Sequence, residues 1–168
     1  GAILSLALGS DTFAELLADV HRYANALHQV GIRRGDGVAL LAPNCDELIT
    51  ATLAAQLVGI AAPMNSALTP EHLAELVSRS GSRALVAAGP DLAPQVWERA
   101  RALAADAGLV ALFALSPTGA DPTPLEPLEG VHVASLSVAA ADQPGDRFLG
   151  PEPEADDIAA LFHTGGTT

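Results

Sequence analysis

Hydrophobic positions follow two different patterns along the first part of the chain. From Thr12 onward, apolar residues recur every three or four positions as far as Val30, which is the spacing of one face of a helix. Thr12 and Glu15 have the spacing of a capping box, in which each side chain bonds the other's backbone amide, and Gly31 can close the helix. The uninterrupted apolar run 38–42 then predicts a strand that is buried on both faces.

The same order of strand and helix repeats further along the chain. Asp46 is expected to cap the second helix, and Thr69 followed by Pro70 is typical of the start of a third. Because helices that connect parallel strands pack on the faces of the sheet, this alternation predicts an α/β fold, a mostly parallel sheet with helices on both faces. The predicted helices cover 12–30, 46–58, 70–80 and 94–107, and the predicted strands cover 38–42, 60–64, 83–88, 109–115 and 158–163.

The segment 115–157 has a different composition. Prolines at positions 117, 122, 124, 127, 144, 151 and 153 interrupt every candidate helix. We expect an irregular, proline-rich connection with one short strand at 131–133. The chain length predicts a single domain over 1–168.

Bulk composition narrows the classes of partner. Hydrophobic residues make up 49% of the chain and charged residues 17%, so the chain is expected to fold. A net charge of -12 disfavours nucleic acid and anionic membranes as partners. The apolar stretch 1–9 lacks basic residues and is too short to cross a bilayer, so no signal peptide and no membrane span are predicted. The single cysteine, Cys45, cannot form an internal disulfide, which favours a cytoplasmic location.

The last residues are the strongest candidate for a binding site. The final predicted strand leads directly into Thr164, Gly165, Gly166, Thr167 and Thr168. Glycines allow backbone N–H groups to approach an anion closely, and threonine hydroxyls donate further hydrogen bonds to phosphate oxygens. The pattern predicts either a phosphate-binding loop or an ordinary turn.

Four stretches of the chain resemble the superfamily of adenylate-forming enzymes, which contains acyl-CoA synthetases, luciferases and peptide-synthetase adenylation domains. They are T-F-A-E-L at 12–16, G-D-G-V-A-L-L-A-P-N at 35–44, L-V-G-I-A-A-P-M-N with L-T-P-E at 57–71, and T-G-G-T-T at 164–168. The last is similar to the start of the family's phosphate loop, threonine-serine-glycine-threonine-threonine-glycine-x-proline-lysine. Gly165 stands where the family usually has serine, His163 stands where it usually has tyrosine, and the sequence stops before the glycine, proline and lysine.

The resemblance implies the amino-terminal subdomain of the large adenylation domain of an acid–thiol ligase, of a kind used in fatty acid metabolism. In that reaction a carboxylic acid attacks the α-phosphate of ATP, which is bound with Mg²⁺, and CoA then displaces AMP from the acyl-AMP. Residues 164–168 would hold the β- and γ-phosphates, and His163 would contact a substrate or pack behind the loop. The family's catalytic lysine and metal-binding glutamate fall after Thr168. No catalytic or metal-binding residue is therefore assigned in this chain, and the chain alone is expected to be inactive.

Several alternatives stay open. A non-enzymatic α/β binding or interaction domain would use the terminal glycines only as a turn, whereas a Rossmann-type domain is disfavoured because no G-x-G-x-x-G follows the first strand. Cys45 lies near a helix start, where a thiol can become reactive, but a packing role is favoured. Asp156 and Asp157 are expected to be solvated turn residues rather than an acid–base couple. Exposed sheet edges predict self-association into a homo-oligomer.

Overall fold

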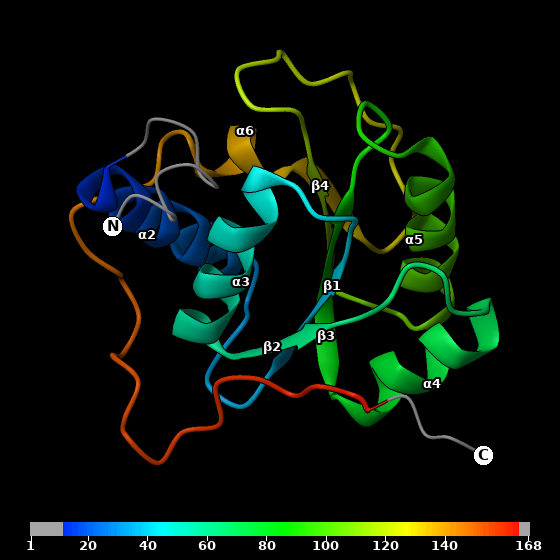
Figure 1. Ribbon diagram of the computed structural model, residues 1–168, viewed down its shortest axis with the longest axis horizontal. Coiled ribbons are helices and arrows are strands. Elements are labelled where there is room, and N and C mark those ends of the chain that lie inside the picture. The colour runs from blue at the N-terminus through cyan, green and yellow to red at the C-terminus, as the bar shows by residue number, and fades with distance from the viewer. Residues whose placement is uncertain (1–11, 165–168) are drawn as a thin grey trace.

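A computed structural model describes residues 12–164, which form one five-stranded sheet with helices on both of its faces (Figure 1). The strand order is β2-β1-β3-β4-β5, and every neighbouring pair is parallel. The predicted α/β class is therefore confirmed. In chain order the elements are α2 (Phe13–Gln29), β1 (Gly37–Leu41), α3 (Asp46–Val58), β2 (Ile60–Pro63), α4 (Pro70–Arg79), β3 (Ser82–Ala88), α5 (Pro94–Asp106), β4 (Ala111–Leu115), β5 (His132–Ser135) and α6 (Leu136–Ala140).

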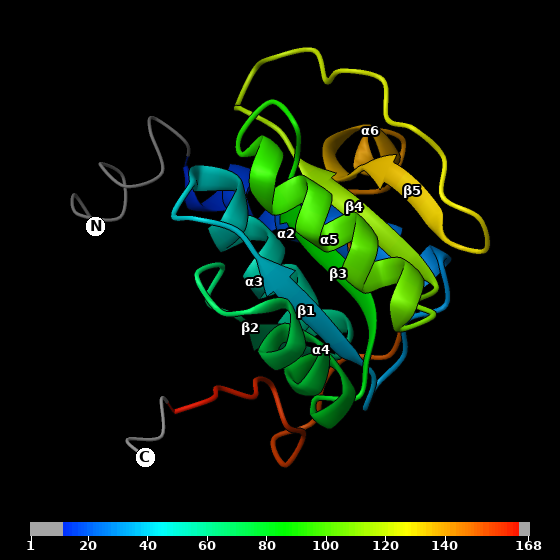
Figure 2. The same ribbon diagram turned by 90° about the vertical axis from the view of Figure 1, so that its right-hand side faces the viewer.

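The helices lie in two layers that enclose the sheet. Figure 2 shows α4 and α5 in front of the strands and α2 and α3 behind them. Val38 of β1 lies beside Ala61 of β2 on one side and Ala84 of β3 on the other, so β1 is an inner strand and β2 an edge strand. Because both faces are covered, the inner strands read as continuous apolar runs instead of alternating with polar residues.

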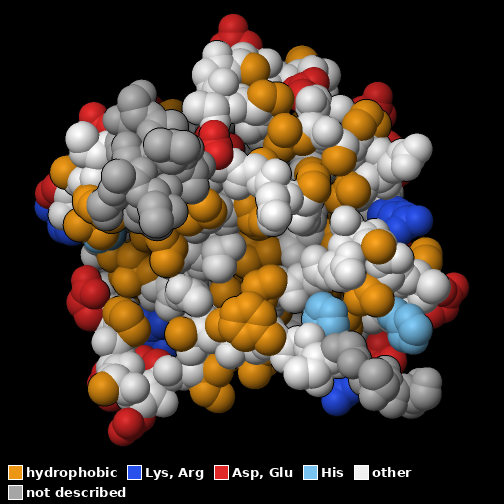
Figure 3. Space-filling model, in the orientation of Figure 1, with side chains coloured by type: hydrophobic (Ala, Val, Ile, Leu, Met, Phe, Trp, Pro, Cys, Tyr) orange, Lys and Arg blue, Asp and Glu red, His pale blue; other side chains and the backbone are white. Residues whose placement is uncertain are grey.

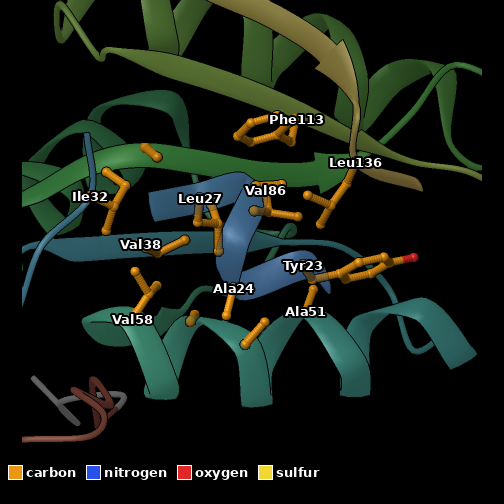
Figure 4. Close-up of a cluster of buried hydrophobic side chains, with 14 of the residues drawn as sticks. Tyr23, Ala24, Leu27, Ile32, Val38, Ala51, Val58, Val86, Phe113 and Leu136 are labelled. Carbon is orange, nitrogen blue, oxygen red and sulfur yellow. The ribbon is translucent and has the colours of Figure 1, made fainter. Parts of the chain in front are cut away.

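Two hydrophobic clusters fill the spaces between the layers. Figure 4 shows the first cluster, in which side chains of α2 and α3 meet those of the strands, with Leu27 and Phe113 fully buried. The second cluster lies between the sheet and the helices α4 and α5, and it includes Leu85, Leu112 and Trp97. Val86 belongs to the first cluster while Leu85 belongs to the second, as expected when successive side chains of a strand point to opposite faces.

Helix starts follow the local signals with one exception. The capping box is present, since the Glu15 amide donates to Thr12 Oγ1 at 3.2 Å and the Thr12 amide donates to Glu15 Oε2 at 2.9 Å. Thr69 caps α4 by accepting a hydrogen bond from the amide of His72. The prediction that Asp46 caps the second helix is wrong, because Asp46 is already helical and Cys45 occupies the cap position without a side-chain hydrogen bond.

The connection over 115–157 is more regular than its prolines suggest. The strand expected at 131–133 is present as β5, but the helix α6 that follows it was not predicted. Both elements lie in a stretch without proline between Pro127 and Pro144. The Leu136 side chain is completely buried, so packing against the rest of the protein stabilises a helix too short to form by itself.

The last predicted strand, 158–163, is wrong as a strand. The segment makes a single parallel bridge, between Ala160 and Ala61 of β2, and is otherwise irregular. Ile158 and Phe162 expose 58% and 73% of their surface, so two of the apolar residues that suggested a strand lie in solvent. Figure 3 shows hydrophobic side chains gathered on the face that this segment crosses. Among the described helices, none combines the length and the apolar character needed to span a membrane.

Candidate functional site at the end of strand β2

The carboxyl-terminal segment runs along the open edge of β2 in the same direction as the strand. The Ala61 amide donates to the Ala159 carbonyl at 2.9 Å, and the Leu161 amide donates to the Ala61 carbonyl at 2.8 Å. Because this segment and β2 run parallel, the residues after Leu161 lie beside the carboxyl end of β2 (Figure 1). The carboxyl ends of parallel strands are where α/β proteins bind ligands.

A hollow of about 310 Å³ lies at this position. Three parts of the chain line it: the end of β2, the second half of α4, and the segment 161–164. The lining residues, apolar and polar together, are Ala62, Pro63, Met64, Leu76, Arg79, Ser80, Leu161, Phe162, His163 and Thr164. The predicted site residues His163 and Thr164 thus meet two polar residues of α4 that the sequence analysis did not single out.

Only the beginning of the predicted phosphate loop is described. His163 and Thr164 are both exposed and lie on the wall of the hollow. Gly165, Gly166, Thr167 and Thr168 lie outside the described residues, so their role in binding phosphate stays a prediction.

Two polar residues of the lining, Arg79 and Ser80, come from the carboxyl end of α4. The Ser80 hydroxyl lies 2.6 Å from the Ser82 hydroxyl and donates to the Val77 carbonyl at 3.1 Å. Arg79 Nη1 lies 3.4 Å from Glu75 Oε1, one turn earlier on the same helix, and both side chains are mostly exposed. An exposed pair of this kind contributes little to stability, so the guanidinium can exchange Glu75 for another anion.

An arginine connects the segment that leads to the site with the end of α3. Arg34 Nη2 donates to the carbonyls of Leu57 at 2.9 Å and Pro151 at 3.0 Å, and Arg34 Nε lies 3.3 Å from Asp157 Oδ2. Asp157 also accepts a hydrogen bond from the Glu154 amide. Asp156 is exposed, as expected, whereas Asp157 is half-buried and paired with Arg34, so it is not the solvated turn residue that was predicted.

The remaining titratable candidates have structural partners elsewhere. Burial raises the pKa of the Cys45 thiol, and the carboxylates of Glu47 and Asp46 act in the same direction, whereas hydrogen bonds from backbone amides oppose them. Burial, together with a hydrogen bond to Glu47, also raises the pKa of Tyr23. These shifts disfavour the reactive-thiol interpretation of Cys45, because nucleophilic cysteines need a lowered pKa.

The histidines away from the hollow do not form a metal site. His21 Nδ1 lies 2.8 Å from the Gly145 carbonyl, and the His28 ring packs edge-on against Phe148 with centroids 5.6 Å apart. Burial lowers the pKa of His28, with the Arg33 charge acting in the same direction. Within residues 12–164, no three His, Cys, Asp or Glu side chains are grouped so that they could hold a metal ion.

Comparison with known proteins identifies the family. Residues 7–168 match the protein family described as AMP-binding enzyme. The chain belongs to this family. This member of the AMP-binding enzyme family is 32% identical over 162 residues to a marinolic acid–CoA ligase of a Pseudoalteromonas species, covering 96% of its own length and 23% of the relative. It is 34% identical over 158 residues to the long-chain-fatty-acid–CoA ligase FadD13 of Mycobacterium tuberculosis, covering 94% of its own length and 27% of the relative.

Solved structures agree with the fold of this family member. Apo MatB from Rhodopseudomonas palustris is similar with a TM-score of 0.70 and 28% identity, over 94% of this chain and 28% of that one. The anthranilate CoA ligase AuaEII in complex with anthranoyl-AMP has a TM-score of 0.71 at 23% identity, over 94% and 28% of the two chains, and supports the fold alone. The predicted resemblance to adenylate-forming enzymes is confirmed. The chain spans about a quarter of the length of these relatives.

Proposed function

We propose that this chain is part of an ATP-dependent acyl-CoA synthetase, in which it forms the amino-terminal subdomain of the large adenylation domain. The observation that carries the proposal is membership of the AMP-binding enzyme family over 7–168, together with relatives above 30% identity that are named as CoA ligases. The reaction would convert a carboxylic acid and ATP to acyl-AMP and pyrophosphate, and CoA would then take the acyl group and release AMP.

The contribution of this chain to that reaction would be electrostatic. We propose that the Thr164 and Thr167 hydroxyls and the amides of Gly165, Gly166 and Thr168 donate hydrogen bonds to the β- and γ-phosphates. Donors that are already oriented stabilise the charge that develops on phosphate oxygens as the bond to pyrophosphate breaks. Because His163 lies on the wall of the same hollow as Thr164, its ring is available to contact a bound substrate.

The Mg²⁺ that such enzymes use with ATP finds no ligand set in the described part of the chain. Within residues 12–164 no group of three or more suitable side chains could hold a metal ion. We therefore assign no step to the metal here. We also propose that the 168-residue chain alone does not turn over, since it spans only about a quarter of the relatives that are named as ligases.

Carboxylate-dependent exchange of pyrophosphate into ATP tests the proposal. The protein encoded by the whole reading frame around this chain would be assayed with long-chain fatty acids, carnitine and crotonobetaine, which are compounds in the names of its relatives. Exchange with at least one acid, followed by CoA-dependent release of AMP, is the expected result. No exchange with any acid, in a preparation that is folded by circular dichroism, would contradict the proposal.

Two matched variants connect the activity to the loop. Thr167→Val removes one donor to phosphate and should lower the exchange rate about tenfold, the effect of one hydrogen bond to a charged group. Thr123→Val removes an exposed hydroxyl that bonds Asp91 Oδ1 at 2.6 Å, outside the hollow, and should leave the rate unchanged. Equal effects of the two variants would argue against a phosphate contact from Thr167.

A further inference from the structure

A single side chain, Arg34, joins three parts of the chain. Arg34 lies in the turn before β1. Its Nη2 donates to the carbonyls of Leu57 at 2.9 Å and Pro151 at 3.0 Å, and its Nε lies 3.3 Å from Asp157 Oδ2. Leu57 belongs to the last turn of α3, which contains no basic residue of its own, so Arg34 also caps the carboxyl end of that helix.

The ion pair of Arg34 with Asp157 is more sheltered than the others. Its side chains are 23% and 30% exposed, whereas every other ion pair within residues 12–164 has at least one side chain that is 47% exposed or more. Water and salt screen a sheltered pair less than an exposed one. This contact is therefore able to hold a chain segment in place.

The segment that leads into the hollow does not determine its own pairing register. Its pairing with β2 consists of one bridge, between Ala160 and Ala61, and Ala160 packs against the first hydrophobic cluster. A slip of one residue would place Ala159 at this position and Asp156 opposite Arg34, where the residue types are the same. The slip would also turn the side chains that follow to the other face.

Arg34 removes this ambiguity because it holds two points of the connection, Pro151 and Asp157. Between them lies a turn that Asp157 closes, since the Glu154 amide donates to Asp157 Oδ2 at 2.7 Å and the Asp157 amide donates to the Glu154 carbonyl at 3.1 Å. The oxygen that closes this turn is also the one that faces Arg34. Asp156 lies one position too early to make both contacts.

We propose that Arg34 is a positioning residue, which sets the register of the segment 158–164 along β2. It thereby places His163 and Thr164 on the lining of the hollow. The register is a property of the chain itself, whereas its consequence for activity rests on the proposed function, because it takes the hollow as part of the synthetase site. In this scheme Arg34 contacts no substrate and acts through Asp157.

Hydrogen exchange of the Leu161 amide, measured by NMR on the 168-residue chain, tests the register. This amide donates to the Ala61 carbonyl at 2.8 Å, which protects it from exchange in the present register. We expect Asp157→Ala and Arg34→Gln each to accelerate the exchange about tenfold. Asp156→Ala is the matched control, since it removes the same side chain from an exposed position, and it should change the exchange by less than about twofold.

A second measurement distinguishes a slip from general loosening. In the unchanged chain, nuclear Overhauser contacts should connect Ala61 with Ala160. In Asp157→Ala, which leaves Asp156 as the remaining partner for Arg34, contacts of Ala61 with Ala159 should appear.

Pyrophosphate exchange by the protein encoded by the whole reading frame measures the effect on the site. Arg34→Gln should lower kcat/KM about tenfold, because a displaced segment misplaces the groups that line the hollow. Arg34→Lys, which keeps the charge but loses the fork of donors, should lower it less. Arg83→Gln, which breaks the more exposed pair with Asp36, should leave it unchanged.

These measurements separate the positioning role from the ligase proposal. The role of Arg34 is overturned if Asp157→Ala leaves hydrogen exchange at Leu161 unchanged or if Asp156→Ala accelerates it equally. It is also overturned if Arg34→Gln keeps full activity in the whole protein. A whole protein without pyrophosphate exchange, together with faster hydrogen exchange at Leu161 in Arg34→Gln and Asp157→Ala, would support the register and contradict the ligase.

Discussion

Asn25 provides the most direct test of how the long connection is attached to the helical layer. Its side chain is 2% exposed on α2 and bonds three backbone groups of a segment more than 110 residues later. Asn25 Nδ2 donates to the carbonyls of Pro144 and Arg147, both at 3.0 Å, and Asn25 Oδ1 accepts from the Leu149 amide at 2.8 Å. Asn25→Ala removes all of these bonds at once.

The expected loss follows from those contacts. A net contribution of about 1 kcal/mol for each of the three hydrogen bonds predicts that Asn25→Ala lowers the free energy of unfolding by about 3 kcal/mol. Asn25→Asp should also destabilise the protein, because a carboxylate oxygen would replace the amide group that donates to the two carbonyls. Gln29→Ala is the control, since the exposed Gln29 bonds Gln143 of the same connection at the protein surface. It should cost less than about 0.5 kcal/mol.

Urea unfolding followed by the fluorescence of Trp97, the only tryptophan of the chain, measures these differences. Trp97 is 4% exposed, so its emission should change when the protein unfolds. Hydrogen exchange of the Leu149 amide reports local detachment of the segment and should accelerate about a hundredfold in Asn25→Ala. A loss below about 1 kcal/mol, without faster exchange at Leu149, would refute the reasoning, as would equal losses for Asn25→Ala and Gln29→Ala.

Three further predictions concern the strand contacts, the cysteine and the exposed apolar segment. Gly37→Ala should lower the free energy of unfolding in urea by about 2–3 kcal/mol, because the new Cβ would lie 2.6 Å from the Ser80 carbonyl oxygen. Gly81→Ala, which has φ +63° and open space around it, should lower it by only about 1 kcal/mol. Equal losses would contradict the packing argument. Because burial raises the pKa of Cys45, its thiol should react with iodoacetamide at pH 8 more slowly than a free thiol. For the same reason its contribution to stability should fall as the pH rises above the ordinary pKa of a thiol. A reaction as fast as that of a free thiol would disprove this. Light scattering should detect self-association of the 168-residue chain, and Phe162→Ser should reduce it, because Phe162 is 73% exposed beside the edge strand β2. A monomer at high concentration would count against this prediction.

Much of the fold could be predicted from the chain because its signals are local. The capping box at Thr12 and Glu15 and the Thr69 cap involve residues three positions apart, so their geometry follows from the helix alone. The apolar runs that became β1 and β4 are buried along their whole length, as their composition predicts. The error at Asp46 is a shift of one residue, and it arose because the residue at the cap position, Cys45, bonds nothing with its side chain.

The errors fall where packing outweighs local preference. Helix α6 has only five residues and no capping hydrogen bond from a side chain, so the buried Leu136 and Ala140 decide its formation. The apolar segment 158–163 carries a strand pattern, yet it makes one bridge to the edge of β2. A pattern of side chains predicts that a segment can pair, but the pairing itself depends on the strand beside it.

The sequence by itself determined the class of the fold, the starts of α2 and α4 and the glycine-threonine stretch that suggested phosphate, because each depends on residues within a few positions of one another. Only the tertiary structure decided that Arg79 and Ser80 share a hollow with His163 and Thr164, and that Asn25 holds the connection at 144–149. Both sets of groups are separated by more than 80 positions, and Arg79 shares a hollow with His163 because residues 159–161 pair with the edge of β2. The physical reason is that hydrophobic periodicity records which face of an element is buried, but not which distant segment covers it.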